Sequence, residues 1–253
     1  MNNETRKETQ VLPKDVRYVG ADDLTLPLFE NQYPVQPMGV SYNSYLILDE
    51  KVVVMDSVDA RAADEWLVKL AHELDGRSPD YLVISHMEPD HSGSILRLAE
   101  RYPEMQLVGN AKTFAMLRQF FGVKAPTDDR LLEVGEGETL PLGAHTLHFM
   151  LAPMVHWPEV MVTYEETEKL LFSADAFGRF GALSRTAAAP WAPQARRYYY
   201  NIVGKYGAQV QALLKKAAAL EIETICPLHG PVLTGGALAE ALRLYDLWSR
   251  WQS

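Results

Sequence analysis

A ten-residue stretch in the first half of the chain constrains the fold more than any other part of the sequence. It reads Ser-His-Met-Glu-Pro-Asp-His-Ser-Gly-Ser and covers residues 85–94. Four side chains that can bind a metal fall within six positions in the order His-x-Glu-x-Asp-His: His86, Glu88, Asp90 and His91. An apolar run at 81–84 precedes them, and a run with helical periodicity begins at Ile95. We therefore predict that a strand delivers a ligand-rich loop to the start of a helix.

The composition excludes several classes of protein. The chain has 253 residues, which is enough to bury the core of one domain. Its formal net charge of −9 argues against nucleic acid or an anionic membrane surface as the main partner. The single cysteine, Cys226, excludes an intramolecular disulfide and a thiolate-rich zinc or iron–sulfur site. No segment approaches the roughly 20 apolar residues of a membrane helix, and no signal peptide is visible, so we expect a cytoplasmic protein.

The order of the predicted elements indicates an α/β fold. Strands are expected at 44–48 and 52–55, as a hairpin, and at 81–84, 106–109, 146–150, 160–164, 169–172 and 222–225. Helices are expected at 61–74, 94–101, 112–121, 200–220 and 236–251, and a long loop at 179–193. Residues 1–14 are predicted to be a flexible tail. The pattern favours a layered α/β sandwich that forms a single domain over residues 15–253.

Three further potential ligands each follow a predicted strand. His156, Asp175 and His229 stand directly after the strands that end near 151, 172 and 225. Because α/β sheets gather their sites at strand ends, we expect these side chains to join the loop at 85–94. The complete set contains seven residues: His86, Glu88, Asp90, His91, His156, Asp175 and His229. Seven ligands are too many for one ion and suit two ions with one carboxylate between them.

The types of ligand narrow the choice of metal. A mixture of imidazole and carboxylate groups suits iron, manganese or zinc, and three carboxylates favour iron or manganese. The other histidines are expected to be structural. His72 lies on an amphipathic helix, and His145 and His148 are three residues apart on a predicted strand, which turns their side chains to opposite faces.

These motifs resemble the diiron domain of flavodiiron proteins, a branch of the metallo-β-lactamase superfamily. The similarity extends from about Val16 to Trp248, and it includes the segments 41–47, 88–93, 156–159, 173–178 and 227–231. Hydrolases of the superfamily typically carry His-x-His-x-Asp-His, whereas flavodiiron proteins carry the sequence His-x-Glu-x-Asp-His found here. Glu88 occupies the position that distinguishes the two groups.

The resemblance implies a four-layer αββα sandwich with two iron ions at one edge. One iron would be held by His86, Glu88 and His156, and the other by Asp90, His91 and His229, with Asp175 bridging both. Members of the family reduce O₂ to water or NO to N₂O, so Asp175 and Glu88 are expected to act as ligands at the reacting site. In some members the histidine that matches His91 turns away from the metal.

Flavodiiron proteins normally continue into a flavodoxin-like domain that binds FMN. The sequence leaves no room for that domain after the helix that holds Trp248, so no FMN is expected in this chain. We therefore predict an O₂-binding protein or oxygen sensor, with a signalling partner, in which the oxidised site is reduced again only slowly. The alternative is an O₂ or NO reductase supplied by a separate electron-donor protein. The head-to-tail homodimer of the family brings flavin and iron together, so the oligomeric state here stays open.

Two further alternatives come from other classes of protein. A dinuclear zinc hydrolase would use a hydroxide between the metals, but the superfamily's hydrolases place histidine where Glu88 stands. A structural metal-binding adaptor would use aromatic residues such as Trp157 and Trp248 as a contact surface, although we expect these rings to pack in the core or the site walls. Within the run Tyr198–Tyr200, Tyr199 is the candidate proton donor to bound O₂.

Overall fold

The structure of the protein is a computed structural model that describes residues 12–251. The first of two six-stranded sheets contains, in spatial order, β1 (Val16–Tyr18), β6 (Tyr45–Leu48), β7 (Val52–Met55), β8 (Tyr81–Val83), β9 (Gln106–Gly109) and β10 (Leu131–Glu133). The second contains β11 (Thr139–Pro141), β12 (Thr146–Leu151), β13 (Met161–Glu165), β14 (Leu170–Phe172), β15 (Thr224–Cys226) and β16 (Leu233–Thr234).

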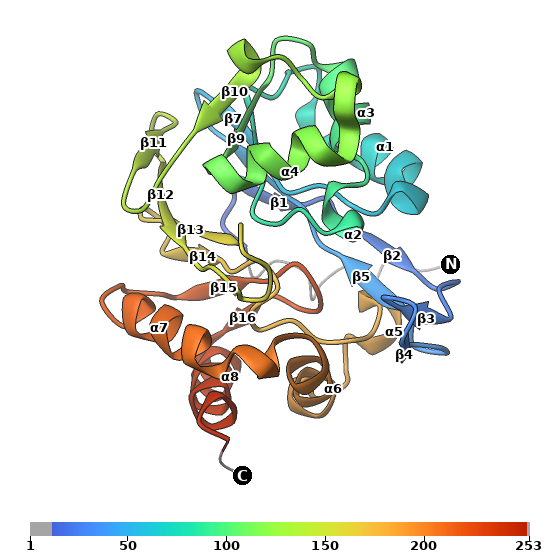
Figure 1. The fold of residues 1–253 in the computed structure, drawn as a ribbon, viewed down its shortest axis with the longest axis vertical. Coiled ribbons are helices and arrows are strands. Elements are labelled where there is room, and N and C mark those ends of the chain that lie inside the picture. Colours follow the sequence, from blue (N-terminus) through green and yellow to red (C-terminus); the bar gives the residue numbers. More distant parts are fainter. Residues whose placement is uncertain (1–11, 252–253) are drawn as a thin grey trace.

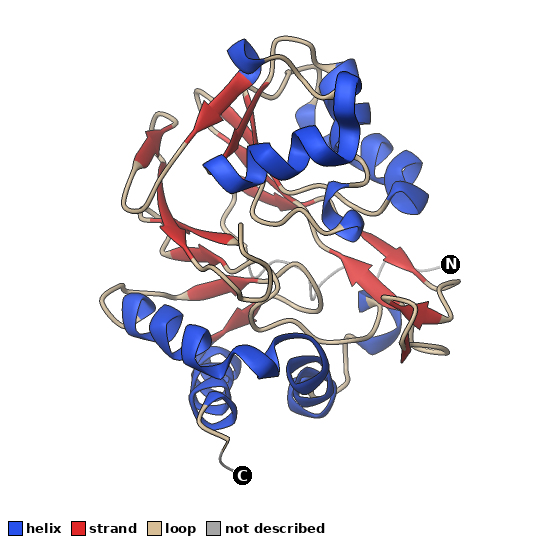
Figure 2. Cartoon of the chain, in the orientation of Figure 1, coloured by secondary structure: helices blue, strands red, loops and turns tan. Residues whose placement is uncertain are grey.

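Helices cover the outer face of each sheet, so the layers run helix, sheet, sheet, helix (Figure 1). The helices beside the first sheet are α1 (Ala63–Leu74), α3 (Ile95–Arg101) and α4 (Ala111–Phe121). Those beside the second sheet are α6 (Trp191–Tyr198), α7 (Gly207–Ala217) and α8 (Gly235–Ser249). The same layering is clear when strands and helices are coloured separately (Figure 2). The predicted αββα sandwich is therefore confirmed.

The alternation of side chains along the strands explains why the sheets pack in this way. Successive side chains of a strand point to opposite faces of its sheet. In β7, Val53 and Met55 face the second sheet, whereas Val52 and Val54 face the helices. Because both faces of this strand are buried, its sequence is apolar throughout. The core between the sheets also takes Phe149 from the second sheet.

The sequence predicted most long elements but missed several short ones, among them β1 and β16. An unpredicted pair of small sheets joins β2 (Ala21–Asp23) to β5 (Val40–Tyr42) and β3 (Leu28–Phe29) to β4 (Tyr33–Pro34). The predicted loop at 179–193 contains α5 (Leu183–Thr186) and the start of α6, so that prediction was wrong. The buried guanidinium of Arg179 donates to the carbonyl oxygens of Thr186 and Ala189 and thereby organises this segment.

The single helix predicted over 200–220 is also divided. A wide turn at Tyr199–Val203 and a tight turn at Gly204–Tyr206 precede α7. A Cβ atom at Gly207 would lie 2.4 Å from the carbonyl oxygen of Ser249, so glycine lets α7 approach the end of α8 closely. Most of the predicted tail at 1–14 lies outside the described residues, and the described Leu12 packs against the core between the sheets. None of the described helices is long and apolar enough to cross a membrane.

The metal-ligand stretch at 85–94 folds much as predicted. It follows β8 and contains the one-turn helix α2 (Pro89–Ser92) before α3 begins at Ile95. Pro89 occupies the first turn of α2, where its missing N–H leaves no hydrogen bond unmade. A Cβ at Gly93 would lie 2.6 Å from the carbonyl oxygen of Pro89 and 2.8 Å from the backbone nitrogen of Ala60, so only glycine fits between these segments. This packing fixes the direction of α2.

Asn110 connects the start of α4 to the second sheet. Its Oδ1 accepts hydrogen bonds from the backbone N–H groups of Lys112 and Thr113, and its Nδ2 donates to the carbonyl oxygen of Glu159 at 2.6 Å. We expect Asn110→Ala to lower the free energy of unfolding by about 1–2 kcal/mol, measured by urea titration. Asn110→Asp keeps the oxygen that accepts from the first N–H groups of α4, so its free energy of unfolding is expected to fall less. Unchanged stability of the alanine variant would contradict this assignment.

Candidate metal centre

The structure brings all seven predicted ligands together in two adjacent groups. His86, Glu88, His156 and Asp175 form one group, and Asp90, His91 and His229 form the other. Within each group the potential ligand atoms lie within 4.8 Å of one another. The first sheet supplies four of the residues through the loop after β8. The second sheet supplies the other three from the segments after β12, β14 and β15, so the site lies where the two sheets meet.

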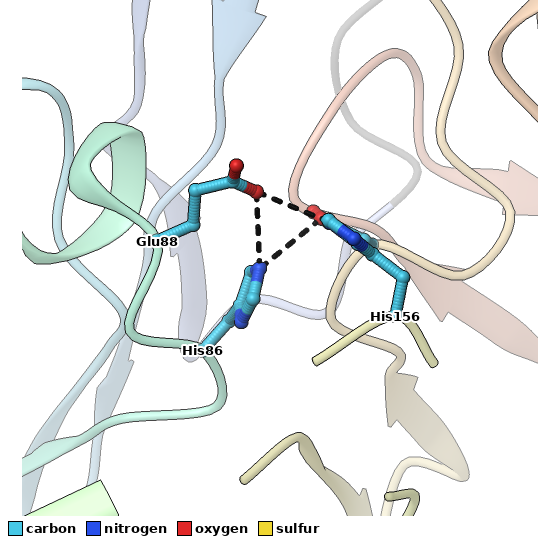
Figure 3. A group of neighbouring side chains, drawn as sticks. His86, Glu88 and His156 are labelled. Carbon is cyan, nitrogen blue, oxygen red and sulfur yellow. Dashed lines mark hydrogen bonds and ion pairs between the residues drawn. The ribbon is translucent and has the colours of Figure 1, made fainter. Parts of the chain in front are cut away.

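The first group converges on a small polar space (Figure 3). Nε2 of His86 and Nε2 of His156 lie 3.2 and 3.1 Å from Oε2 of Glu88. These three side chains come from the loop after β8 and the loop after β12, which are about 70 residues apart in the chain. Both histidines are buried, and Glu88 is only 8% exposed.

The second group has the same character. Nε2 of His91 and Nε2 of His229 lie 3.0 Å apart, and Oδ2 of Asp90 lies 3.3 and 3.2 Å from them. All three residues are buried. Two ring nitrogens that face each other at this distance need a proton or a cation between them, since each otherwise presents a lone pair to the other.

Asp175 lies between the two groups and contacts both. Its Oδ2 is 3.0 Å from Nε2 of His156 and 3.5 Å from Nε2 of His86. Its Oδ1 is 3.4 Å from Nε2 of His91 and 3.6 Å from Nε2 of His229. Each carboxylate oxygen therefore faces a different pair of imidazoles, which is the arrangement of a bridging ligand.

The side chains fit a pair of metal ions. Atoms that each lie about 2.1 Å from one ion, at right angles, are about 3 Å apart, and the spacings in both groups are close to this value. Both carboxylate oxygens of Asp90 and Oδ1 of Asp175 are buried without a hydrogen-bond partner in the described residues. Buried carboxylates without partners are costly, and a bound cation would relieve that cost. The donors are nitrogen and oxygen atoms only, which excludes a soft-metal site among the described residues.

Outer partners hold two of the imidazoles firmly. Nδ1 of His86 donates to Oε1 of Glu159 at 2.7 Å, and Glu159 also accepts from the backbone N–H of Met87. Nδ1 of His229 donates to the carbonyl oxygen of Ser41 at 2.6 Å. These contacts fix each ring so that its Nε2 faces the centre. Nδ1 of His91 is buried without such a partner among the described residues, so this ring is the least constrained of the three.

The carboxylates shift the pKa values of the histidines. Burial disfavours the charged form of His156, but hydrogen bonds to Asp175 and Glu88 outweigh it and raise its pKa to about 9. Burial is likewise outweighed at His86, where hydrogen bonds to Glu159 and Glu88 raise the pKa well above its usual value. The same contacts hold the pKa values of Glu88 and Asp175 well below theirs, against the effect of burial. Metal ions would therefore displace protons when they bind.

A cavity of about 700 Å³ opens over the centre. Its lining includes Glu88, Asp90 and His156 at the centre, together with the β3–β4 turn and the segment that contains Lys205. Glu30, in the β3–β4 turn, adds a carboxyl group that no sequence motif singled out. Burial and the charge of Glu88 raise the pKa of Glu30 to about 7.

Within the run Tyr198–Tyr200, the tyrosine beside the metal ligands is Tyr198 and not the predicted Tyr199. The ring of Tyr199 contacts Tyr200, Tyr245 and Trp248, away from the ligands. The neighbouring Tyr198 lies with its ring centroid 5.5 Å from that of His229, and its hydroxyl is buried without a partner in the described residues. Successive residues of a helix point about 100° apart, so the choice between the two tyrosines depends on the phase of α6.

The remaining histidines have structural surroundings. His145 and His148 pair with Glu165 and Glu166, and His72 is exposed on α1 beside Glu73. Glu159 is a further residue to which the sequence pattern assigned no role, although it stands three positions after His156. Its buried carboxylate supports His86 from the opposite sheet.

Comparison with known proteins places this geometry in a family. A family profile described as "ODP family beta lactamase" matches residues 40–230. The rubredoxin-oxygen oxidoreductase of Megalodesulfovibrio gigas is 36% identical over 225 residues, which cover 86% of this chain and 55% of that protein. The anaerobic nitric oxide reductase flavorubredoxin of Vibrio vulnificus is 33% identical over 226 residues, which cover 86% of this chain and 45% of that protein.

A solved structure agrees with these similarities. The flavodiiron protein of Giardia intestinalis superposes with a TM-score of 0.88 at 32% identity, covering 96% of this chain and 59% of that one. The chain thus spans about half the length of the curated relatives that it matches. The chain belongs to the metallo-β-lactamase-like domain family of flavodiiron proteins.

Without metal, the stability of the protein is expected to depend on pH through the site. The pKa of His156 rises from about 6.5 when unfolded to about 9 when folded, so protonation favours the folded state most below pH 6.5. This contribution disappears as the pH rises through 9. We expect the Tm of protein treated with a chelator to fall between pH 6.5 and 9.5 in calorimetry, and metal-loaded protein to show a smaller fall. A rising Tm over this range would contradict the assignment.

Glu159 is expected to strengthen metal binding through His86. Glu159→Ala leaves Nδ1 of His86 without its acceptor, and loss of such outer partners typically weakens metal affinity about 10–100-fold. Competition with a chromophoric chelator would measure the change. Glu159→Gln keeps an acceptor oxygen without the charge, so its metal affinity should lie between that of the native protein and that of the alanine variant. An alanine variant with unchanged affinity would show that the His86 contact has no such effect.

Proposed function

We propose that this domain binds two iron ions at the seven-residue centre and reacts there with O₂ or NO. The observation that carries the proposal is the position of Asp175, whose two carboxylate oxygens face different pairs of histidines. A carboxylate in this position suits two ions a short distance apart. It would stabilise both and neutralise part of their charge.

Iron is favoured over zinc by the ligands and by the relatives. Glu88, Asp90 and Asp175 supply three carboxylates to balance the charge of two ions, and no thiolate is present in the centre. The names of two relatives refer to oxygen reduction and to nitric oxide reduction. These similarities support a redox centre over the dinuclear zinc hydrolase.

The protein residues bind, orient and shield the centre. Bound iron would supply the electrons and the coordination position for a diatomic gas. Glu159 and Ser41 hold His86 and His229 in the orientation needed for binding. We assign the role of proton donor to Tyr198 in place of Tyr199, because the Tyr198 ring lies beside His229. Burial raises the pKa of the Tyr198 phenol well above its usual value, which keeps its proton in place at neutral pH.

Reduction of O₂ or NO requires electrons from outside the centre. We propose a separate protein donor, because one relative's name pairs the oxidoreductase with rubredoxin. The oxygen-sensor hypothesis differs in one measurable property, the rate at which the oxidised centre is reduced again. Slow return to the reduced state favours a sensor, and rapid repeated turnover favours a reductase.

Metal analysis and a pulse of O₂ test the proposal together. Protein prepared anaerobically with iron should contain two iron atoms per chain and consume O₂ after reduction, observed by stopped-flow absorbance. The same protein with a simple electron donor distinguishes one oxidation event from repeated turnover. Two zinc atoms and no iron per chain after growth with iron would refute the proposed function.

Asp175→Ala is expected to remove both irons or leave one weakly held, because both groups lose a ligand. Iron content after desalting measures this effect. The Asp175→Asn variant has a side chain of similar shape and should bind iron more weakly than the native protein. Asp129→Ala, at an exposed position outside the centre, is the matched control. Circular dichroism shows that each variant is folded. Two tightly bound irons in folded Asp175→Ala would disprove the bridging role.

A further inference from the structure

The positive charge of this acidic protein is concentrated in one segment. Residues 176–220 contain seven lysine and arginine residues and no aspartate or glutamate. The chain as a whole has a net charge of −9, so the other residues together carry −16 (−9 less the +7 of this segment). This separation of charge is unrelated to the ligands of the metal centre, because Asp175 is the last acidic residue before the segment.

Six of these cations form no salt bridge with a described residue. Arg179 is buried and Lys215 lies on α7 away from the cavity, which leaves four. They are Arg185, Arg196, Arg197 and Lys205, and we call them the basic rim. None of the four forms a salt bridge with a described residue, whereas Arg61 and Lys216 do. Arg185, Arg196 and Lys205 are exposed, and Arg197 is partly exposed. Unpaired, exposed cations raise the local potential and attract negative partners.

Contacts with the backbone place two members of the basic rim next to one wall of the cavity, and a third member lines the cavity. Arg197 donates to the carbonyl oxygen of Pro34, and Arg185 donates to that of Pro37, next to the β3–β4 turn that forms one side of the cavity. Lys205 lines the cavity itself. The exposed Tyr200 lies beside Arg196, whose guanidinium carbon is 5.8 Å from the tyrosine ring centroid.

Nearby acidic groups do not cancel this charge. The carboxylate of Asp22 accepts from the backbone N–H groups of Leu183 and Ser184 at the start of α5. Asp59 and Asp23 pair with Arg61 on another side of the cavity. Glu30 lines the cavity beside Glu88. The rim is therefore positive around a centre that bound metal would partly neutralise.

We propose that the basic rim is the docking surface for an acidic electron-donor protein. This inference rests on the proposed function and names both the charge of the partner and the surface it contacts. A donor docked on the rim faces the cavity, whose wall includes Glu88, Asp90 and His156, so no folded layer separates it from the centre. Each encounter transfers one electron. The donor loses it, the metal pair gains it, and two encounters reduce both ions.

A protein partner fits better than a nucleic acid. The rest of the chain has a net charge of −16, so a long polyanion that extended beyond the four cations would be repelled. A small acidic protein can match a patch of this size, and complementary charge raises its association rate and fixes its orientation. The exposed Tyr200 supplies an aromatic contact of the kind found in protein interfaces.

Charge reversal tests the docking surface by binding. The probe is a reduced rubredoxin of net negative charge, titrated into the metal-loaded protein by isothermal calorimetry at low and high salt. The double variant Arg196→Glu/Lys205→Glu is expected to weaken binding at least about tenfold at low salt. Lys215→Glu is the matched control, since it removes an exposed cation of the same segment on α7, away from the cavity.

Stopped-flow reduction separates docking from reaction at the metals. Reduction by rubredoxin should slow about tenfold in the double variant and lose most of its salt dependence. Reduction by methyl viologen, a small cationic donor that needs no docking surface, should not become slower. Failure of every donor to reduce the native centre would refute the proposed function, whereas the calorimetric result would still decide the docking.

Three results would overturn the docking proposal. The first is equal rubredoxin binding by the native protein and the double variant. The second is an equal loss of binding in the Lys215→Glu control, which would show that only net charge matters. The third is evidence that the rim binds another partner. A DNA oligonucleotide that binds more tightly than rubredoxin at physiological salt would show this, and so would a dimer of the native protein in ultracentrifugation that is absent only in the double variant.

Discussion

The carboxylate of Asp175 is the interaction on which the rest of the centre depends. It is buried at the end of a strand of the second sheet and contacts histidines from both groups. Several structural features keep it there. The hydroxyl of Ser173 donates a hydrogen bond to the carbonyl oxygen of Ala176 and so closes the turn around Asp175. Arg179, a few residues later, binds the backbone of the following segment.

The sandwich architecture explains why the centre lies between the sheets. The first sheet contributes one continuous loop with four ligands, and the second contributes single ligands at three strand ends. Each of the two ligand groups therefore contains residues from both sheets, and neither sheet supplies a complete group alone. Hydrogen bonds that cross between the layers then align the two halves, as when Glu159 reaches His86 and Asn110 reaches the carbonyl oxygen of Glu159.

Local sequence patterns were enough to predict the layers and to select the residues that gather at the centre. The ligands follow apolar strands directly, so their position depends on elements that are easy to recognise. The short helices α5 and α6 were missed because their segment is organised by hydrogen bonds from the Arg179 side chain to carbonyl oxygens 7 and 10 residues later, which periodicity does not reveal. Glu30 could not be found because its turn is placed by pairing between β3 and β4 and not by periodicity. The choice between Tyr198 and Tyr199 required the helical phase of α6, which a run of three tyrosines conceals.

The separation of the ligands along the chain has a thermodynamic consequence. His91 and His229 meet at 3.0 Å although they are 138 positions apart in the sequence. An ion shared by such residues acts as a reversible cross-link that closes a very long loop. Because the unfolded chain does not hold these ligands together, the ion binds the folded state alone, and its binding free energy adds to the stability of the fold. The supply of metal would thus set the fraction of chains that are unfolded, and with it how long a newly made chain stays exposed to proteolysis.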